Sequence, residues 1–420
     1  MQSELELRKI NTVLILLLLW MNFSIFDITG HLPIKNHYSE IQEPLNDVIE
    51  ADRVEIQQYY PHDPITISSD SEFASQGFNG SGTIADPYQI EGLNIAASKS
   101  ALIEIRHTKA YFTIRNNILN GMFKASSGIK LYNVLNGSIE NNIIFNHESD
   151  GINLFLASYI TITNNTITNN FNGINLGPGR EGPRTYNSVT NNKINNNRLS
   201  GILSDRSRCN LLSNNIITEN QQAGIWLTGS YESTLSANLI INNSLPGIYL
   251  SFSSISAISS NTILNNGYTG VHILGSRQVN VSSNTISSNG YEGLLFIDSS
   301  ESRVLNNTVS TNYGYGVHLN EFTQNVTITG NNFLGNNQQG GSQARDEGQG
   351  NIFEANYWDD WSSIDLSYPI EGIVDYQDQI SYSKSEDPFI VKTNVIFGLC
   401  VLIVIISALI VIIRKQVLYK

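Results

Sequence analysis

Hydrophobic and polar positions in the middle of the chain repeat with a period of 23 residues. Glycine recurs in this step at Gly201, Gly224, Gly247, Gly270, Gly293 and Gly316. Asparagine recurs nine residues before each glycine, at Asn192, Asn215, Asn238, Asn261, Asn284 and Asn307. A fixed period in this range, in segments rich in Asn, Ser, Thr and Ile without a 3.6-residue pattern, predicts a solenoid of β-strands.

Three aliphatic positions accompany each repeat. In one repeat they are Leu212, three residues before the asparagine, Ile217, two residues after it, and Ile225, directly after the glycine. Alternation such as Ile225-Trp226-Leu227 turns every second side chain outward. The pattern predicts an all-β fold, a single-stranded parallel β-helix with three short strands per turn. About ten turns are expected, each advancing by about 4.8 Å.

The polar columns are expected at corners between strands. An asparagine there tolerates left-handed backbone angles, and its amide can bond to the same amide one turn away. A second column five residues later, including His147, Asn170 and Asn197, predicts the next corner. The glycine column is expected where a side chain would clash or where φ is positive. We interpret these columns as architectural, with ligand binding as the alternative.

Both ends of the chain carry apolar runs. Residues 1–29 contain a basic pair followed by an apolar stretch, which is typical of a signal peptide or a signal-anchor. Residues 394–413 include nineteen consecutive uncharged positions, and the basic tail 414–420 follows them. This pattern predicts a transmembrane helix with its C-terminal end in the cytoplasm. We therefore expect a single-pass anchor and an extracellular or periplasmic β-helix.

The remaining segments divide by composition. We expect a linker over residues 30–60, an N-terminal cap with the first turn over 61–110, and the repeats over 111–350. Residues 351–390 are aromatic and out of register, and they predict a C-terminal cap and juxtamembrane segment.

Charge argues against one class of partner, and cysteine content argues against a disulfide. The chain has 37 acidic and 24 basic residues, a net charge of −13, which argues against a nucleic-acid partner. Cys209 lies in a repeat and Cys400 in an apolar run, so no disulfide is expected.

The repeat resembles the right-handed parallel β-helix proteins of the NosD-like, carbohydrate-binding and sugar-hydrolase superfamily over about residues 60 to 380. The matching motifs are the G-I-x-L…I-x-x-N-x-I repeat, the GSGT-x-x-DPY-x-I-x-G segment at Gly80–Gly92, and N-Y-W-D-D-W at Asn356–Trp361. The family pattern has glycine before that last asparagine, where this chain has Ala355. The resemblance implies a right-handed coil. It leaves activity open, because the superfamily includes binders, lyases, hydrolases, epimerases and a copper-site maturation factor.

Outward side chains two residues after the glycines form the first candidate site. Trp226, Tyr249, His272 and His318 carry rings on one predicted strip. Exposed flat rings stack on the apolar faces of sugars, and the turn spacing would let a glycan follow the strip. In the alternative interpretation, neighbouring rings only pack on one another.

Two acidic residues form the catalytic candidate. Asp298 and Glu321 each lie five residues after their glycine in consecutive repeats. Their backbones are expected about 5 Å apart, close to the carboxyl separation in retaining glycosidases. His272 and His318 should flank this pair, but they are too distant to chelate one metal together. The alternative is a solvated acidic edge.

An insertion between Gly173 and Gly201 gathers positive charge. Arg180, Arg184, Arg206 and Arg208 lie in or near it, and arginine suits the carboxylate or sulfate groups of an acidic glycan. A solvated loop is the alternative. The insertion also contains G-x-G-x-x-G at 177–182, but no helical pattern follows, so a dinucleotide site is not predicted.

Metal-binding motifs are absent from the sequence, and no metal or other cofactor is expected. Calcium at acidic turns, such as Asp359, Asp360 and Asp375, is an unspecific alternative. The sequence favours a surface protein that binds polysaccharide or another surface polymer. A carbohydrate-active hydrolase or lyase, which needs clustered acids and bases, is the first alternative. A structural or adhesion stalk, which needs neither feature, is the second.

Overall fold

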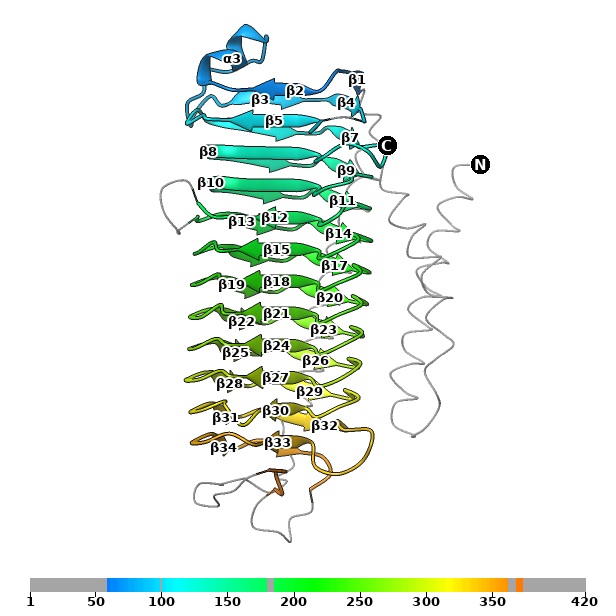
Figure 1. Ribbon diagram of the computed structural model, residues 1–420, viewed down its shortest axis with the longest axis vertical. Coiled ribbons are helices and arrows are strands. Elements are labelled where there is room, and N and C mark those ends of the chain that lie inside the picture. The colour runs from blue at the N-terminus through cyan, green and yellow to red at the C-terminus, as the bar shows by residue number, and fades with distance from the viewer. Residues whose placement is uncertain (1–58, 99, 180–184, 362–367, 373–420) are drawn as a thin grey trace, which may run out of the picture. The chain divides into compact units, whose positions relative to one another are not determined.

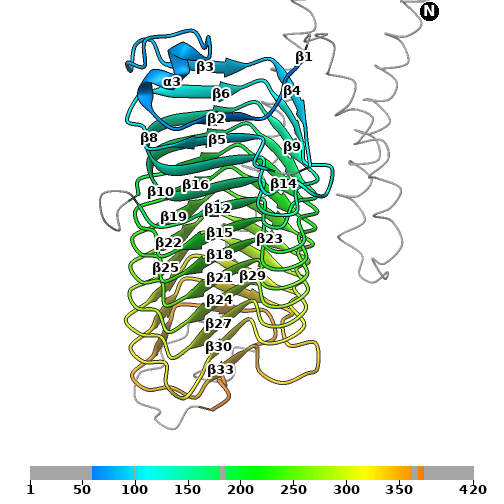
Figure 2. The ribbon, with the colours of Figure 1, turned by 45° about the horizontal axis from the view of Figure 1, so that its top comes forward.

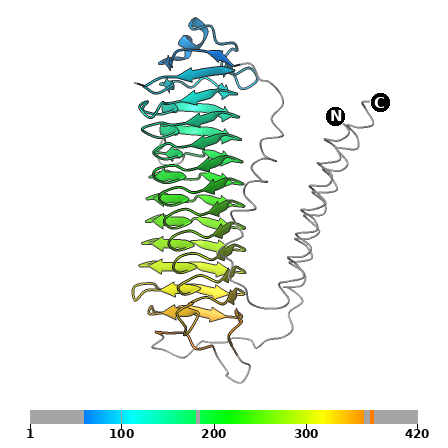
Figure 3. The ribbon, with the colours of Figure 1, turned by 90° about the vertical axis from the view of Figure 1, so that its right-hand side faces the viewer.

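The repeats fold into stacked turns, each containing three short strands. The computed structural model describes residues 59–98, 100–179, 185–361 and 368–372 (Figure 1). Corresponding strands of successive turns pair in parallel, so that three ladders run along the stack. Figures 2 and 3 show the same stacking from two further directions.

The ladders are numbered in the order in which the chain meets them after each glycine. Ladder 1 contains β2 Ile65–Ile67, β5 Ile103–Arg106, β8 Ile129–Glu140, β10 Ile152–Thr163, β12 Ile174–Leu176, β15 Ile202–Asp205, β18 Ile225–Thr228, β21 Ile248–Ser251, β24 Val271–Leu274, β27 Leu294–Ile297, β30 Val317–Leu319 and β33 Ala344–Asp346. Ladder 2 contains β3 Tyr88–Glu91, β6 Phe112–Arg115, the second halves of β8 and β10, β13 Ser188–Thr190, β16 Leu211–Ser213, β19 Thr234–Ser236, β22 Ala257–Ser259, β25 Asn280–Ser282, β28 Arg303–Leu305, β31 Thr327–Thr329 and β34 Ile352–Glu354. Ladder 3 contains β1 Tyr60–Pro61, β4 Leu93–Ala96, β7 Ile118–Asn120, β9 Ile143–Phe145, β11 Thr166–Thr168, β14 Lys193–Asn195, β17 Ile216–Thr218, β20 Leu239–Ile241, β23 Thr262–Leu264, β26 Thr285–Ser287, β29 Thr308–Ser310, β32 Asn332–Leu334 and β35 Tyr357–Trp358.

The register of the ladders follows the sequence period. Ile225 pairs with Ile248, and Ile248 pairs with Val271. Strands β8 and β10 continue from ladder 1 into ladder 2. The predicted parallel β-helix with three strands per turn is confirmed. Ladder 3 contains 13 strands within the described residues, more than the expected number of turns.

The core is built from the predicted aliphatic columns. Ile225, Leu235 and Ile240, one from each ladder, are fully buried, and the same holds for their equivalents in the neighbouring turns. Within each strand, the side chains that alternate with these buried residues face outward and are at least partly exposed, as the sequence alternation predicts. Burial of these columns removes apolar surface from water at every turn, which provides the main driving force for stacking.

A ladder of buried asparagines occupies the corner between ladders 2 and 3. Asn261 shows the pattern, because its backbone N–H and its Nδ2 both donate to Oδ1 of Asn284, at 2.8 and 3.0 Å. Its Nδ2 also donates to the carbonyl of Leu235, at 2.9 Å. The amide-to-amide bonds of this ladder link Asn117, Asn142, Asn165, Asn192, Asn215, Asn238, Asn261, Asn284, Asn307, Asn331 and Asn356. The predicted asparagine ladder is therefore present.

The left-handed residue at this corner is not the asparagine, as the sequence suggested, but the residue before it. Asn214, Ala237 and Ser260 have φ between +54° and +56°. The ladder asparagines Asn215, Asn238 and Asn261 do not have positive φ, so the left-handed turn lies one residue earlier. Ala355, where the family pattern has glycine, occupies this position with φ of +52°.

The glycine column is explained by steric contact rather than by φ. A Cβ on Gly201 would lie 2.5 Å from Cγ2 of Ile217 and 2.7 Å from the carbonyl oxygen of Gly224, both closer than van der Waals contact allows. Gly201 is absent from the residues with positive φ. Of the two expectations for this column, the clash is the one that applies.

A third polar column, at the corner between ladders 1 and 2, was missed in the sequence. The backbone N–H of Ser230 donates to Oγ of Ser253 at 3.0 Å, and that of Ser253 donates to Oγ of Ser276 at 2.8 Å. The column contains Ser207, Ser230, Ser253, Ser276, Ser299 and Thr323. The step of 23 residues between its serines was the available signal.

The first turn is closed by a short helix. Helix α3, Asp70–Ser75, buries Phe73, whose ring stacks on Tyr88 at 4.6 Å between ring centroids. The motif that follows needs its glycine, because Gly80 has φ of +115° and a Cβ there would lie 2.3 Å from the carbonyl oxygen of Pro87. The GSGT segment is therefore structural at this position.

The last turn is closed by aromatic rings and by an amide. Trp358 stacks between Phe333 and Tyr368, with ring centroids 4.3 and 4.0 Å away. Burial is the largest cause that raises the pKa of Tyr368, whose hydroxyl donates to Asp360. The second polar column ends where Asn336 Nδ2 donates to Oε1 of Gln343, at 3.0 Å.

The segments predicted to meet the membrane lie outside the described residues. These are the signal or signal-anchor at 1–29, the transmembrane segment 394–413 and the tail 414–420, and most of the linker 30–60 is outside as well. Within the part of the chain that the structure describes, no helix is long and apolar enough to cross a membrane.

His147 begins the second polar column and generates a pH prediction. Its backbone N–H donates to Oδ1 of Asn170, and burial lowers the pKa of its ring to about 4. Between about pH 6.5 and pH 4 the unfolded chain therefore binds a proton at this residue that the folded chain does not. The free energy of unfolding should fall as pH decreases through this range.

We predict that His147→Asn makes the melting temperature less dependent on pH in this window, because an amide fits the column and does not titrate. The measurement is thermal unfolding, followed by circular dichroism at several pH values. Some dependence should remain, since burial also lowers the pKa of His272 to about 4. An unchanged slope in the variant would contradict the assignment.

Candidate functional site

Three rings form a contiguous strip on the outer face of ladder 1. Trp226 pairs with Tyr249, and Tyr249 pairs with His272, on strands β18, β21 and β24. The ring centroids lie 5.2 and 4.8 Å apart, and the ring planes are tilted by 48° and 41°. The side chains are partly buried. The rings thus pack on one another and still contribute to the surface, so both interpretations of this column describe part of the geometry.

Two tyrosines widen this strip. Tyr268 lies beside His272, with 6.3 Å between ring centroids, and packs on Tyr291 at 4.5 Å. Tyr291 is 50% exposed. Both precede a glycine of the repeat by two residues, which was the signal that sequence reasoning missed. We call Trp226, Tyr249, Tyr268, His272 and Tyr291 the aromatic surface.

His272 contributes a neutral ring to the aromatic surface. Burial is the largest cause that lowers its pKa to about 4, against an opposing effect of the Glu292 carboxylate. Its Nε2 is buried without a hydrogen-bond partner among the described residues, as is Nε1 of Trp226. At neutral pH the ring therefore offers a flat, uncharged face.

An ionisable cluster adjoins the aromatic surface toward the C-terminal end. His318 lies between two carboxylates, with Nδ1 3.6 Å from Oε1 of Glu292 and Nε2 3.4 Å from Oε2 of Glu347. Arg345, the next residue in register after His318, pairs with Glu347 at 2.5 Å. The ring of Tyr315 lies 5.5 Å from that of His318. We call these five residues the ionisable cluster.

Hydrogen bonds and burial shift pKa values within the ionisable cluster. The guanidinium of Arg345 lowers the pKa of the Glu347 carboxyl. Burial, followed by the hydrogen bond to Glu371, raises the pKa of Tyr315, whose hydroxyl donates to Oε2 of Glu371 at 2.6 Å. The cluster thus brings a carboxylate pair, an imidazole and a protonated phenol onto the face that carries the aromatic surface.

The four histidine and aromatic candidates fall on one ladder but do not form an unbroken strip. Leu295 stands between His272 and His318 in the register of ladder 1, and it is only 6% exposed. Trp226, Tyr249 and His272 therefore belong to the aromatic surface, whereas His318 belongs to the ionisable cluster.

The catalytic candidates Asp298 and Glu321 are both exposed at the corner after ladder 1. Asp298 has φ of +51°, and its Oδ1 accepts a hydrogen bond of 3.0 Å from Nδ2 of Asn320. One additional residue in the next turn shifts the register, so that Ser300 pairs with Gln324. The backbone N–H of Asp298 also donates to Oδ1 of Asn320, so its partner in the next turn is Asn320, the neighbour of Glu321. Catalysis by the pair remains a prediction.

Two of the four arginine candidates lie within the described residues. Arg180 and Arg184 lie outside the described residues. Arg206 is exposed and pairs with Asp205 at 3.0 Å. The guanidinium of Arg208 lies over the ring of Tyr231, 4.6 Å from its centroid. Both described guanidiniums therefore already contact neighbouring side chains.

The acidic turn proposed for calcium is partly described. Nε2 of Gln343 donates to both Asp359 and Asp360, at 2.8 Å each, and Asp375 lies outside the described residues. Among the residues that the structure describes, no group of three or more His, Cys, Asp or Glu side chains is placed to hold a metal ion.

Comparison with known proteins identifies the family to which the fold belongs. The family model described as the right-handed β-helix region matches residues 77–240 and 210–357. The chain belongs to the right-handed β-helix family. This membership agrees with the three parallel ladders and the handedness implied by the sequence motifs.

Solved structures of the right-handed β-helix fold include carbohydrate-active proteins. The A-module of mannuronan C-5 epimerase AlgE4 from Azotobacter vinelandii aligns with a TM-score of 0.53 and 15% identity, over 78% of this chain and 90% of that module. The AlgE6 A-module from the same organism aligns with a TM-score of 0.50 and 12% identity, over 75% and 94%. At these identities the likeness shows the fold alone. No curated protein matches the sequence significantly.

Proposed function

We propose that this right-handed β-helix protein binds a polysaccharide along ladder 1, with the aromatic surface as the contact. The observation that carries the proposal is the in-register series Trp226, Tyr249 and His272, extended by the exposed ring of Tyr291. Aromatic faces stack on the C–H faces of sugars, and neighbouring rings about 5 Å apart make a continuous platform for an extended chain.

The neighbouring structures support polysaccharide as the ligand class. Two of them are epimerase modules whose names state that they act on mannuronan. The neutral state of His272 also favours stacking, because an uncharged imidazole is desolvated at less cost than an imidazolium.

Alanine at Trp226 and Tyr249 tests the binding surface. Both side chains lie outside the buried columns, so the fold should persist with a modest fall in melting temperature, while affinity should fall by about 1–3 kcal/mol. The measurement is titration with the strongest polysaccharide from an array of neutral and acidic glycans. Tyr60→Ala, which removes an exposed ring from ladder 3, is the matched control. Equal affinity of the double variant and the wild type would contradict the proposal.

We also propose that the apolar run at 395–413 anchors the β-helix outside the membrane, which its length and the following basic residues support. Deletion of all residues after Lys392 should release the protein from the membrane fraction, if the N-terminal segment is cleaved. Cell fractionation measures this. Persistent membrane attachment would assign a second anchor to residues 10–26.

Catalysis on carbohydrate is the second candidate function, and the ionisable cluster is the observation that favours it. An imidazole within 3.6 Å of two carboxylates, next to a phenol, provides groups for general acid and base chemistry. His318 lies on the same ladder as Trp226, Tyr249 and His272, so a chain bound along that ladder would pass the cluster.

Amide substitutions distinguish the two functions. If the ionisable cluster is catalytic, His318→Gln and Glu292→Gln should lower turnover of a polysaccharide about 10²–10⁴-fold while binding persists. Asp298→Asn and Glu321→Gln test the sequence-derived pair in the same assay of reducing ends and unsaturated products. Turnover that survives all four substitutions would exclude both sets as the catalytic groups.

A further inference from the structure

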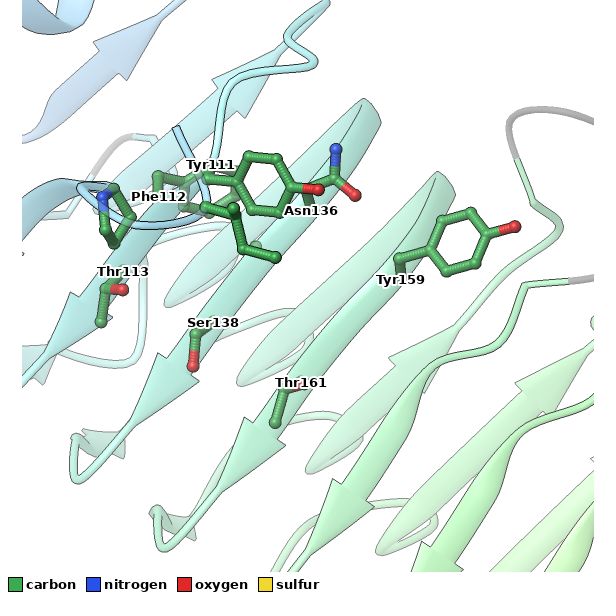
Figure 4. Close-up of a pocket in the computed structure, with 10 residues that line it drawn as sticks. Tyr111, Phe112, Thr113, Asn136, Ser138, Tyr159 and Thr161 are labelled. Carbon is green, nitrogen blue, oxygen red and sulfur yellow. The ribbon is translucent and has the colours of Figure 1, made fainter. Parts of the chain in front are cut away.

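A pocket on ladder 2 lies apart from the surfaces described above. It has a volume of about 310 Å³ and lies across β6, β8 and β10, near the N-terminal end of the stack (Figure 4). Its lining residues include Tyr111, Thr113, Ser138, Tyr159 and Thr161. This volume is at the lower end of the range for small-molecule sites, so it suits a ligand of one or two sugar rings.

Three hydroxyls stand in a row in this pocket. Thr113 pairs with Ser138, and Ser138 pairs with Thr161, on three consecutive turns. Figure 4 shows the three side chains aligned on neighbouring strands. None of these hydroxyls has a hydrogen-bond partner within the part of the chain that the structure describes. Adjacent strand spacing places the row at intervals of about 4.8 Å, which suits several hydroxyls of one small ligand.

An aromatic wall adjoins the hydroxyl row. Tyr159 is 52% exposed, and its ring stacks on that of Tyr186 with 5.5 Å between centroids and 12° between planes. Their φ angles are +60° and +49°, in the left-handed region that bulky residues rarely adopt. Asn136 occupies the same corner position one turn earlier. This corner position has a positive φ in every turn from Asn136 as far as Asn325, also where Ile255 occupies it, so the angle belongs to the coil. Tyr159 differs in presenting an exposed ring beside the hydroxyl row.

The charge of the pocket restricts its ligand. None of its lining residues is Asp, Glu, Lys, Arg or His. A carboxylate or ammonium group would lose its hydration there without gaining a counter-charge. Hydroxyls, amides and aromatic faces instead match an uncharged polyol.

We propose that this pocket binds an uncharged pyranose mono- or disaccharide. Tyr159 contacts the C–H face of one sugar ring, while Thr113, Ser138 and Thr161 bond to its hydroxyls. The site lies on ladder 2, whereas the aromatic surface lies on ladder 1, so it goes beyond the proposed function and does not depend on it.

The experiment is titration of the full-length protein in detergent with glucose, galactose, mannose and their disaccharides, followed by saturation-transfer NMR and calorimetry. We expect saturable binding of at least one of these sugars and weaker binding of glucuronate. Tyr159→Asn should raise the melting temperature, because asparagine tolerates the left-handed backbone, and should weaken binding about tenfold. Thr161→Val, which keeps the shape and removes one hydroxyl, should also weaken binding. Tyr313→Ala, at an exposed tyrosine outside the pocket, should leave binding unchanged.

Three results would overturn this proposal. One is the absence of saturable binding by every uncharged sugar, or a preference for glucuronate. Another is wild-type affinity in Tyr159→Asn. The third is loss of small-sugar binding in the Trp226→Ala, Tyr249→Ala double variant, because that result would assign the signal to the aromatic surface. Retention of small-sugar binding in this double variant supports the pocket whatever happens to its polysaccharide affinity.

Discussion

The asparagine ladder at the corner between ladders 2 and 3 is the interaction on which the other features depend. Each buried amide accepts from the backbone and side chain of the preceding turn and donates to the next turn and to a strand carbonyl. Asn238 accepts from Asn215 and donates to Asn261 and to the carbonyl of Leu212. A net gain of about 1 kcal/mol per bond is modest, but an unpaired buried amide costs more than a bond contributes. If one turn shifted along its neighbours, the asparagine amides at that turn and the adjacent turns would be buried without partners. The ladder therefore fixes the register along the stack.

Fixed register explains how short strands present ordered surfaces. Strands of three or four residues cannot specify a pairing alone, because a shift of one residue exchanges their buried and exposed faces. With the corners held, the outward residue of each turn can vary without altering the core. Trp226, Tyr249 and His272 are stacked for this reason: their neighbours in the chain are buried, and their spacing is set by the ladders.

Periodicity determined how much could be predicted from the sequence. The three ladders, the aliphatic columns and the outward position of Trp226 all repeat every 23 residues, so subtraction of residue numbers was enough to find them. The serine column repeats in the same way, but serine also occurs at many other positions of the repeats, so this column does not stand out. The left-handed position was misplaced by one residue, because asparagine is abundant both in the ladder and immediately before it, as at Asn214 and Asn215.

The ionisable cluster and the pocket could not be found by the same route, because the period does not show which outward side chains meet. Glu347 and Glu371 reach His318 and Tyr315 from irregular segments after the last regular turns. The wall of the pocket depends on Tyr159, an exposed ring at a corner position where other turns carry Asn136 or Glu232. In a solenoid the regular turns supply a scaffold of known spacing, so chemistry that needs unlike groups at one point must come from its ends, its insertions or the outward positions that vary between turns.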